Sequence, residues 1–172
     1  EFRGTKLAEA VSMAVHESQS RLWENIVGRS RVFWERNFLA LSALLGKAGE
    51  DLDFKSFIES INRVSPSLIR TEADEVTYGL HIIARFELES ALLDGNLRVT
   101  DVPGAWREKY KQLLGLEVSN DREGCLQDVH WSIGYFGYFP SYALGNLYAA
   151  QFWAKLKEEV PDIEARIASG DV

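Results

Sequence analysis

The sequence predicts an all-α protein, mainly helical, with at most a minor hairpin or edge strand. Two observations carry this prediction. Apolar residues recur at three- and four-residue steps along most of the chain, which is the spacing of one helical face. Breaks that contain glycine or proline separate these stretches. The 172 residues, 46% of them hydrophobic, are enough for one core, so we expect 1–172 to form a single helical unit.

The first third of the chain predicts three helices. Residues 7–27 repeat leucine, valine and alanine at helical spacing. A second helix is predicted over 30–46, with Ser30 as its N-cap and Gly46 at the position that a C-terminal glycine favours. A short third helix follows near 54–64.

The middle of the chain predicts one long helix. A Ser-Pro-Ser sequence at 65–67 interrupts the helical pattern. The Thr-Glu-Ala-Asp sequence at 71–74 has the form of a capping box, which opens a helix. We expect this helix to run to about Leu93 and to end at the Asp-Gly-Asn sequence of 94–96.

The remaining residues predict further helices and one short exception. Only 97–102 alternates as a strand does, and Pro103 ends that stretch before another helix. Two more helices are predicted over 121–135 and 140–158. Pro161 suits the first turn of a last helix.

Composition narrows the classes of function. The formal net charge is −7 and no run of lysine or arginine is present to neutralise phosphates, so we expect no nucleic-acid partner. No apolar stretch approaches the roughly 18 residues of a membrane span, so we expect a soluble protein without a membrane partner. The single cysteine, Cys125, excludes an internal disulfide and a multi-cysteine zinc cluster, which favours the cytoplasm.

Glu17 lies in the middle of the first predicted helix, and two interpretations are open. It can pair with Arg21 at i+4 as a solvated helical salt bridge. It can also be a zinc ligand, because catalytic zinc commonly takes two histidines and one glutamate. The histidines at 16, 81 and 130 do not supply a pair at i and i+4.

Arg70 and the segment 124–142 offer further polar candidates. Arg70 follows the proline-bounded turn, where a guanidinium can face a cleft and bind a carboxylate through two parallel hydrogen bonds; a surface arginine is the alternative. Asp128 can orient an imidazole and His130 can donate to a developing oxyanion, although a structural hydrogen-bond network would give the same pattern. The tyrosines that follow can point phenols into a cleft or form an aromatic core stripe.

Three segments taken in order resemble the motifs of the carboxypeptidase Taq family. They are His-Glu-Ser-Gln at 16–19, Ile-Arg-Thr-Glu-Ala-Asp at 69–74, and the glycine-to-tryptophan segment 124–131. Residues 20–25 and 136–142 are also similar to this family. The resemblance therefore runs through nearly the whole chain, and the combination is far more specific than any one segment.

The resemblance implies a portion of the catalytic domain of a zincin-like helical metallopeptidase that removes single residues from peptide C-termini. In the family, zinc or cobalt is held by the two histidines of an HExxH sequence and a downstream glutamate, which corresponds to Glu17. Arg70 corresponds to the residue implicated in holding the terminal carboxylate of the substrate. Similarity to the wider angiotensin-converting-enzyme-like group implies that His130 and Tyr138 stabilise the oxyanion and that Tyr135 binds the substrate terminus.

The sequence departs from the family in one respect. It contains no HExxH, which in the family lies shortly upstream of the motif with the metal-binding glutamate, and it opens at Glu1 without a methionine. We therefore expect a fragment that binds no metal and has no peptidase activity alone, whose parent is a zinc enzyme acting on peptides with a free C-terminus. The family also implies a homodimer. The alternative is a non-catalytic helical interaction module derived from the family.

Overall fold

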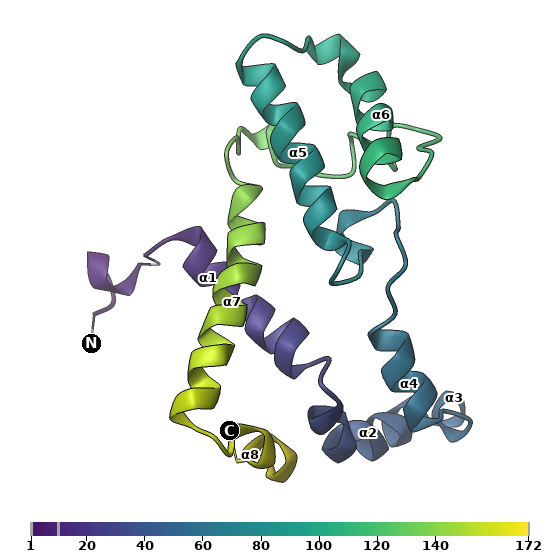
Figure 1. The fold of residues 1–172 in the computed structure, drawn as a ribbon, viewed down its shortest axis with the longest axis vertical. Helices are drawn as coiled ribbons and strands as arrows, with labels where there is room; N and C mark the ends of the chain where they lie inside the picture. The colour runs from purple at the N-terminus through teal and green to yellow at the C-terminus, as the bar shows by residue number, and fades with distance from the viewer. Residues whose placement is uncertain (1, 10, 172) are drawn as a thin grey trace. The chain divides into compact units, whose positions relative to one another are not determined.

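The structure is a computed structural model that describes residues 2–9 and 11–171. Within these residues every regular element is helical (Figure 1), which confirms the all-α prediction. The chain divides into two compact units, Glu1–Arg63 with Leu144–Val172, and Val64–Ala143, and each is described by itself. That 1–172 acts as one part of a larger catalytic domain stays a prediction.

The first unit begins with a shorter helix than the sequence indicated. A 3-10 turn, η1 (Lys6–Ala8), is followed by α1 (Met13–Arg21) and a π-helical segment, η2 (Leu22–Val27). The predicted continuous helix over 7–27 is therefore wrong in its first part. The Ser12 hydroxyl accepts a hydrogen bond from the Val15 amide at 3.1 Å, so the helix starts where that cap satisfies its first donors.

Helix α2 (Arg31–Leu45) confirms the prediction made from its two ends. The Ser30 hydroxyl accepts from the Phe33 amide at 3.2 Å, and Gly46 takes a positive φ of 56°. Two shorter helices follow, α3 (Lys47–Glu50) and α4 (Phe54–Ile61). Aromatic rings join α2 to α4, because the Trp34 and Phe57 rings meet edge to face with centroids 4.7 Å apart.

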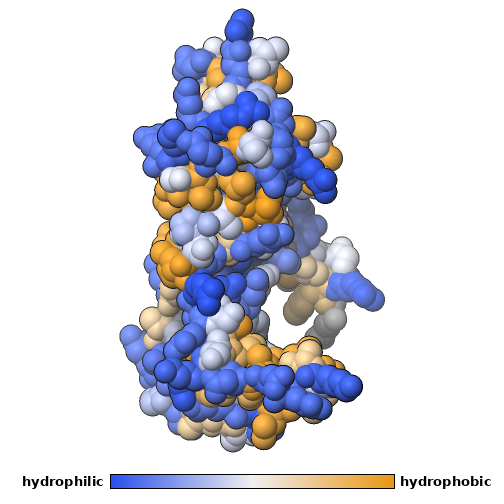
Figure 2. Space-filling view, turned by 90° about the vertical axis from the view of Figure 1, so that its right-hand side faces the viewer, coloured by the Kyte–Doolittle hydropathy of each residue, from blue (hydrophilic) through white to orange (hydrophobic). Residues whose placement is uncertain are grey.

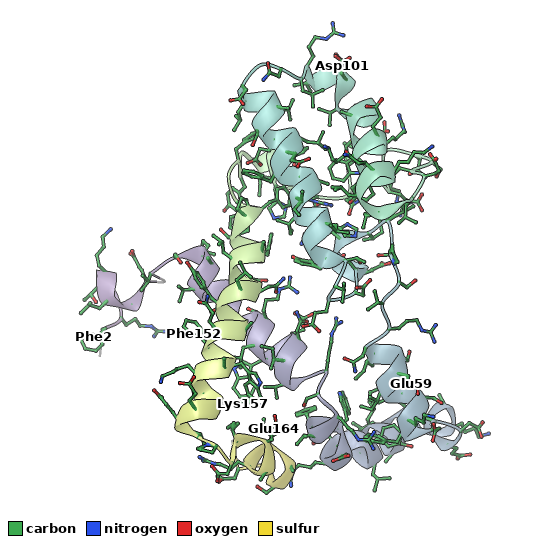
Figure 3. The ribbon with its side chains drawn as sticks, in the orientation of Figure 1. Phe2, Glu59, Asp101, Phe152, Lys157 and Glu164 are labelled. Carbon is green, nitrogen blue, oxygen red and sulfur yellow. The ribbon has the colours of Figure 1, made fainter. Side chains whose placement is uncertain are left out.

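The end of the chain completes the first unit. Helix α7 (Pro140–Glu159) confirms the prediction over 140–158, and its residues from 144 onward belong to this unit. Lys157 Nζ lies 2.9 Å from Glu164 Oε1 (Figure 3), across the turn into α8 (Ile163–Ser169). Pro161 precedes that helix, whose N-cap position is taken by Asp162. Four buried side chains form the core of the unit, namely Leu22, Val27, Ala149 and Ile167.

Two long helices dominate the second unit. Helices α5 (Tyr78–Leu93) and α6 (Val102–Leu114) lie side by side (Figure 1). The rings of Trp106 and Tyr110 stack with centroids 5.0 Å apart. The strand-like stretch 97–102 was predicted wrongly: it holds a 3-10 turn, η4 (Val99–Asp101), that runs directly into α6.

The start of α5 differs from the predicted capping box. A 3-10 turn, η3 (Arg70–Glu72), occupies that position, and α5 begins only at Tyr78. The reason is local, because Asp74 Oδ1 accepts from the amides of Val76 and Thr77 at 2.9 and 2.8 Å. A side chain that bonds its own following backbone in this way competes with helix formation.

The predicted helix over 121–135 is wrong. Apart from a 3-10 turn, η5 (Trp131–Ile133), these residues form irregular turns. Gln127 Nε2 donates to the carbonyl of Leu68 at 3.1 Å, and Gln127 Oε1 accepts from the amide of Arg70 at 2.9 Å. These contacts with a segment almost 60 residues away replace a regular helical ladder, and they place Asp128 and His130 next to Arg70.

Apolar residues also reach the surface. Figure 2 shows hydrophobic residues between hydrophilic ones on the face that it presents. In the structure as a whole, the exposed apolar side chains include Leu39 and Leu44 of α2. Exposed apolar side chains are found on most folded proteins. Across residues 2–9 and 11–171, no helix has the length and apolar character needed to cross a bilayer.

Candidate functional site

The second unit contains an ion-pair cluster of one carboxylate and two guanidiniums. Asp128 Oδ1 accepts from Arg70 at Nη2 (2.7 Å) and Nε (3.0 Å). Asp128 Oδ2 accepts from Arg85 Nε at 2.7 Å, and Arg85 Nη2 lies 2.6 Å from the same oxygen. All three side chains are largely buried. Because each carboxylate oxygen serves one arginine, Asp128 fixes the position of both.

Burial and charge act in opposite directions on this cluster. Burial by itself raises the pKa of the Asp128 carboxyl, but Arg85 and Arg70 outweigh it and hold that pKa below its ordinary value. Burial by itself lowers the pKa of the Arg70 guanidinium, and its bonds to Asp128 raise it on balance. Both groups are therefore charged near neutral pH.

Arg85 is fully enclosed, and its other donors are also used. Arg85 Nη1 donates to the His81 carbonyl at 2.8 Å and to the Tyr110 hydroxyl at 3.1 Å, and Arg85 Nη2 donates to Gln127 Oε1 at 2.8 Å. Since the Tyr110 hydroxyl accepts from Arg85, its own proton points to His81 Nδ1, 3.0 Å away. We assign the neutral Nε2–H tautomer to His81 on that ground. Burial and the nearby Arg85 and Arg70 lower the pKa of His81 to about 4.

Arg70 is buried rather than on the surface, so the interpretation as a surface arginine is wrong. Its Nη1 donates to the Tyr78 hydroxyl at 3.2 Å. Its Cζ lies 4.9 Å from the ring centroid of Tyr142 and 5.9 Å from that of Phe139, within the range of cation–π attraction. The guanidinium is thus held by a carboxylate at one edge and by aromatic rings around it.

His130 lies next to the same cluster. Its Nε2 is 3.1 Å from the Tyr142 hydroxyl, and its Nδ1 lies 3.8 Å from Asp128 Oδ1, beyond hydrogen-bonding distance. Nδ1 is buried without a hydrogen-bond partner among the residues that the structure describes. Burial lowers the pKa of His130, the Asp128 charge raises it, and the two arginines lower it again. On balance the pKa is lowered, so the imidazole is mainly neutral at neutral pH.

Two further tyrosines continue this group of rings. Tyr138 has its centroid 5.5 Å from that of His130 and 5.3 Å from that of Tyr142. Tyr135 is exposed, and its ring lies 5.7 Å from Tyr138. The structure therefore brings together four residues singled out in the sequence, Arg70, His130, Tyr135 and Tyr138, through Tyr142.

Glu17 belongs to the first unit, on α1. Its Oε1 accepts from Arg21 Nε at 2.9 Å, which confirms the expected i,i+4 partner, but the pair is partly buried rather than solvated. Helix α7 approaches it closely at Gly145, where an added Cβ would lie 2.7 Å from Glu17 Cγ and 2.9 Å from Glu17 Cβ. Only glycine leaves room for the Glu17 side chain at this contact.

The donors that the structure describes around Glu17 do not by themselves form a complete metal site. Among the residues described, no three histidine, cysteine, aspartate or glutamate side chains gather as a metal site requires. Catalytic zinc takes three protein ligands, so these residues do not supply a complete site around Glu17. Its role as a zinc ligand stays a prediction.

Sequence reasoning missed several residues of the site, and α5 carries a signal that could have found them. His81, Arg85 and Glu89 follow one another at four-residue steps and are all buried. Residues four apart lie on one helical face. A polar stripe beside the buried apolar residues of the same helix indicates an internal network rather than a solvated face.

The structure is similar to solved carboxypeptidases. It matches the structure of Pyrococcus furiosus carboxypeptidase with a TM-score of 0.93 and 40% identity, covering 97% of this chain and 33% of that one. Thermostable carboxypeptidase 1 of Thermus thermophilus is 53% identical over 171 residues, which is 99% of this chain and 33% of the relative. Carboxypeptidase 1 of Bacillus subtilis is 45% identical over 168 residues, 98% of this chain and 34% of the relative.

The family follows from the sequence as a whole. Residues 1–172 match the family described as carboxypeptidase Taq (M32) metallopeptidase. The chain belongs to this family, as the motifs indicated. It spans about a third of the length of the curated relatives it matches.

Proposed function

We propose that this chain supplies one metal ligand and the substrate-binding residues of a metallocarboxypeptidase that releases single C-terminal amino acids from peptides. The family match over residues 1–172 carries this proposal. Arg70, His130, Tyr135 and Tyr138 support it, because they gather in one unit although up to 68 positions separate them in the sequence.

Arg70 would bind the terminal carboxylate of the peptide. An arginine has five N–H donors, and its bonds to Asp128 and Tyr78 use one each on Nε, Nη2 and Nη1. One donor therefore remains on each terminal nitrogen, and a pair of this kind can take a carboxylate. A fixed cation at this position would restrict cleavage to the last residue of a chain.

His130 and Tyr138 would act on the oxyanion that forms during cleavage. A neutral imidazole has one N–H and a phenol has one O–H, so each can donate one hydrogen bond to the developing charge. Because burial lowers the pKa of His130, the imidazole would donate this hydrogen bond in its neutral form at neutral pH. Tyr135, exposed beside Tyr138, would contact the substrate terminus.

Glu17 would be one ligand of a zinc or cobalt ion, whose other ligands lie outside the residues described. The metal would supply the Lewis acid of the reaction. The 172-residue chain alone would be inactive for lack of those ligands. We further propose a homodimer in the cytoplasm, which the single Cys125 thiol suits because a reducing compartment maintains it.

The test is a chimera in which this chain replaces the matching third of Bacillus subtilis carboxypeptidase 1, to which it is 45% identical. We expect the chimera to release the last residue of a peptide with a free C-terminus and not of its amidated form. Glu17→Gln should remove bound zinc and activity together. Arg70→Lys should raise KM about tenfold or more, because lysine lacks the planar pair of donors.

The control uses a matched ion pair of the same unit. Arg31 and Glu35 form an i,i+4 pair at 2.8 Å on the exposed surface of α2, and Glu35→Gln should leave zinc content and activity unchanged. Two results would contradict the proposal: peptidase activity of the isolated 172-residue chain, or unchanged zinc content in the Glu17→Gln chimera.

A further inference from the structure

Glu89 is a buried carboxylate that the proposed chemistry does not use. It lies on α5 with 3% of its surface exposed. Its Oε2 accepts from the indole Nε1 of Trp131 at 2.6 Å, and its Oε1 accepts from the backbone amide of Gly137 at 2.5 Å. Hydrogen bonds to a charged acceptor are about twice as strong as neutral ones. A carboxylate buried at the cost of its hydration needs such partners.

The segment between these two donors has little other regular structure. It contains the single turn η5 and two glycines in the left-handed region, Gly134 with φ 81° and Gly137 with φ 78°. Left-handed backbone conformations interrupt a helical ladder. The amides of Ile133, Gly134 and Tyr135 bond to carbonyls of residues 129–131, near the first end of the loop. Glu89 contacts both ends, and at the second end it accepts from the Gly137 amide.

The loop carries the residues that the proposed function needs. Trp131 and Gly137, which bond to Glu89, are the two anchors of the loop. His130 precedes Trp131, Tyr138 follows Gly137, and Tyr135 lies between the anchors. The rings of His130 and Tyr138 are 5.5 Å apart across the ends of the loop. A shift of either anchor would change this distance.

We propose that Glu89 is a positioning residue that fixes the Trp131–Gly137 loop, and through it His130, Tyr135 and Tyr138, against α5. The proposal that this loop serves catalysis rests on the proposed function; the anchoring itself rests on the two hydrogen bonds. Glu89 touches no reacting atom and acts through Trp131 and Gly137.

The number of acceptors at position 89 gives a graded test. A carboxylate offers an acceptor oxygen to each donor, a glutamine amide has one oxygen, and leucine has none. Glu89→Gln should keep one of the two bonds and Glu89→Leu should lose both. Glu87→Gln is the matched control, because Glu87 lies on the same helix but is exposed and pairs with Lys109 at 2.6 Å.

The first measurement is hydrogen exchange by NMR in the 172-residue chain, read at the Gly137 amide and the Trp131 indole N–H. In Glu89→Leu both should exchange about 10- to 100-fold faster, the loss expected when a hydrogen bond to a charged group is removed. In Glu89→Gln only one of the two protons should exchange faster. The Glu87→Gln control should match the unsubstituted chain, and circular dichroism would verify that each variant is folded.

The second measurement is kcat in the Bacillus subtilis chimera. We expect kcat to fall with the number of hydrogen bonds lost at position 89, less in Glu89→Gln than in Glu89→Leu. Zinc content should be unchanged. Unaltered exchange at both protons in folded Glu89→Leu would overturn the anchoring. Faster exchange with unaltered kcat would overturn its role in catalysis. An inactive unsubstituted chimera would instead count against the proposed function, since the exchange result does not depend on activity.

Discussion

Replacing Asp128 by asparagine should be among the most destabilising single changes in the second unit. The carboxylate accepts from both Arg70 and Arg85 through separate oxygens. Asparagine keeps one acceptor and turns an NH2 group toward the other guanidinium. Breaking a buried ion pair costs about 3 to 5 kcal/mol, because the remaining charge stays buried without compensation. That is a large fraction of the 5 to 15 kcal/mol of stability typical of a domain.

Urea unfolding followed by circular dichroism and tryptophan fluorescence would measure this loss. With an m-value of about 2 kcal/mol/M, the midpoint of the transition that involves the second unit should fall by about 1.5 to 2.5 M. The control is Asp101→Asn, since Asp101 (labelled in Figure 3) pairs with Arg98 at 2.7 Å in an exposed i,i+3 pair. Exposed pairs contribute about 0 to 1 kcal/mol. A midpoint in Asp128→Asn no lower than in Asp101→Asn would refute the reasoning.

The pH dependence gives an independent measure of the same contact. Because the pKa of Asp128 is lowered in the folded chain, the stability that it contributes is present above the ordinary value of about 3.9. It is lost as pH falls through the lower folded pKa. The difference in unfolding free energy between the unsubstituted chain and Asp128→Asn should therefore be constant near neutral pH and narrow below about pH 4.

Two further predictions concern α7 and α5. Gly145→Ala should push the Glu17 side chain aside, since the new Cβ would lie 2.7 Å from Glu17 Cγ; we expect a cost of about 1 to 3 kcal/mol in urea unfolding and weaker zinc binding in the chimera. Gly104→Ala, at a helical glycine with open space around it, should not destabilise and serves as the control. The folded pKa of His81 is about 4, below its unfolded value of about 6.5, so the unfolded chain binds the proton first and stability should fall by up to about 3 kcal/mol between pH 6.5 and 4. His81→Gln should flatten this dependence in urea unfolding, and His16→Gln, at an exposed position, should not.

The sequence predicted those helix ends that local chemistry determines. Ser30 and Gly46 bound α2 as expected, because a cap hydroxyl and a glycine with positive φ act within a few residues. The segment 121–135 could not be predicted in this way. Its conformation depends on the bonds of Gln127 to the backbone of Arg70 and Leu68, and helical periodicity carries no information about a partner so distant in the chain.

The site shows the same division between local and distant information. Family motifs identified Arg70, His130, Tyr135 and Tyr138, and the structure brings all four together. They did not identify Arg85 or Glu89, because each lies within a helix whose other buried residues read as an ordinary core. The polar residues at four-residue steps were visible in the sequence. Their partners Asp128 and Trp131 come from turns that were predicted as a helix, and Gly137 lies just beyond that stretch.

The charge of the ion-pair cluster bears on the proposed role of Arg70. Two guanidiniums share one carboxylate, so the three groups together carry a net charge of +1. Arg85 is completely enclosed and donates to groups of the unit itself. Arg70 instead keeps two donors beyond those used by Asp128 and Tyr78 and lies beside Tyr142, which contacts His130. If Arg70 binds the carboxylate of a peptide C-terminus as proposed, the net positive charge of these three groups would favour that binding.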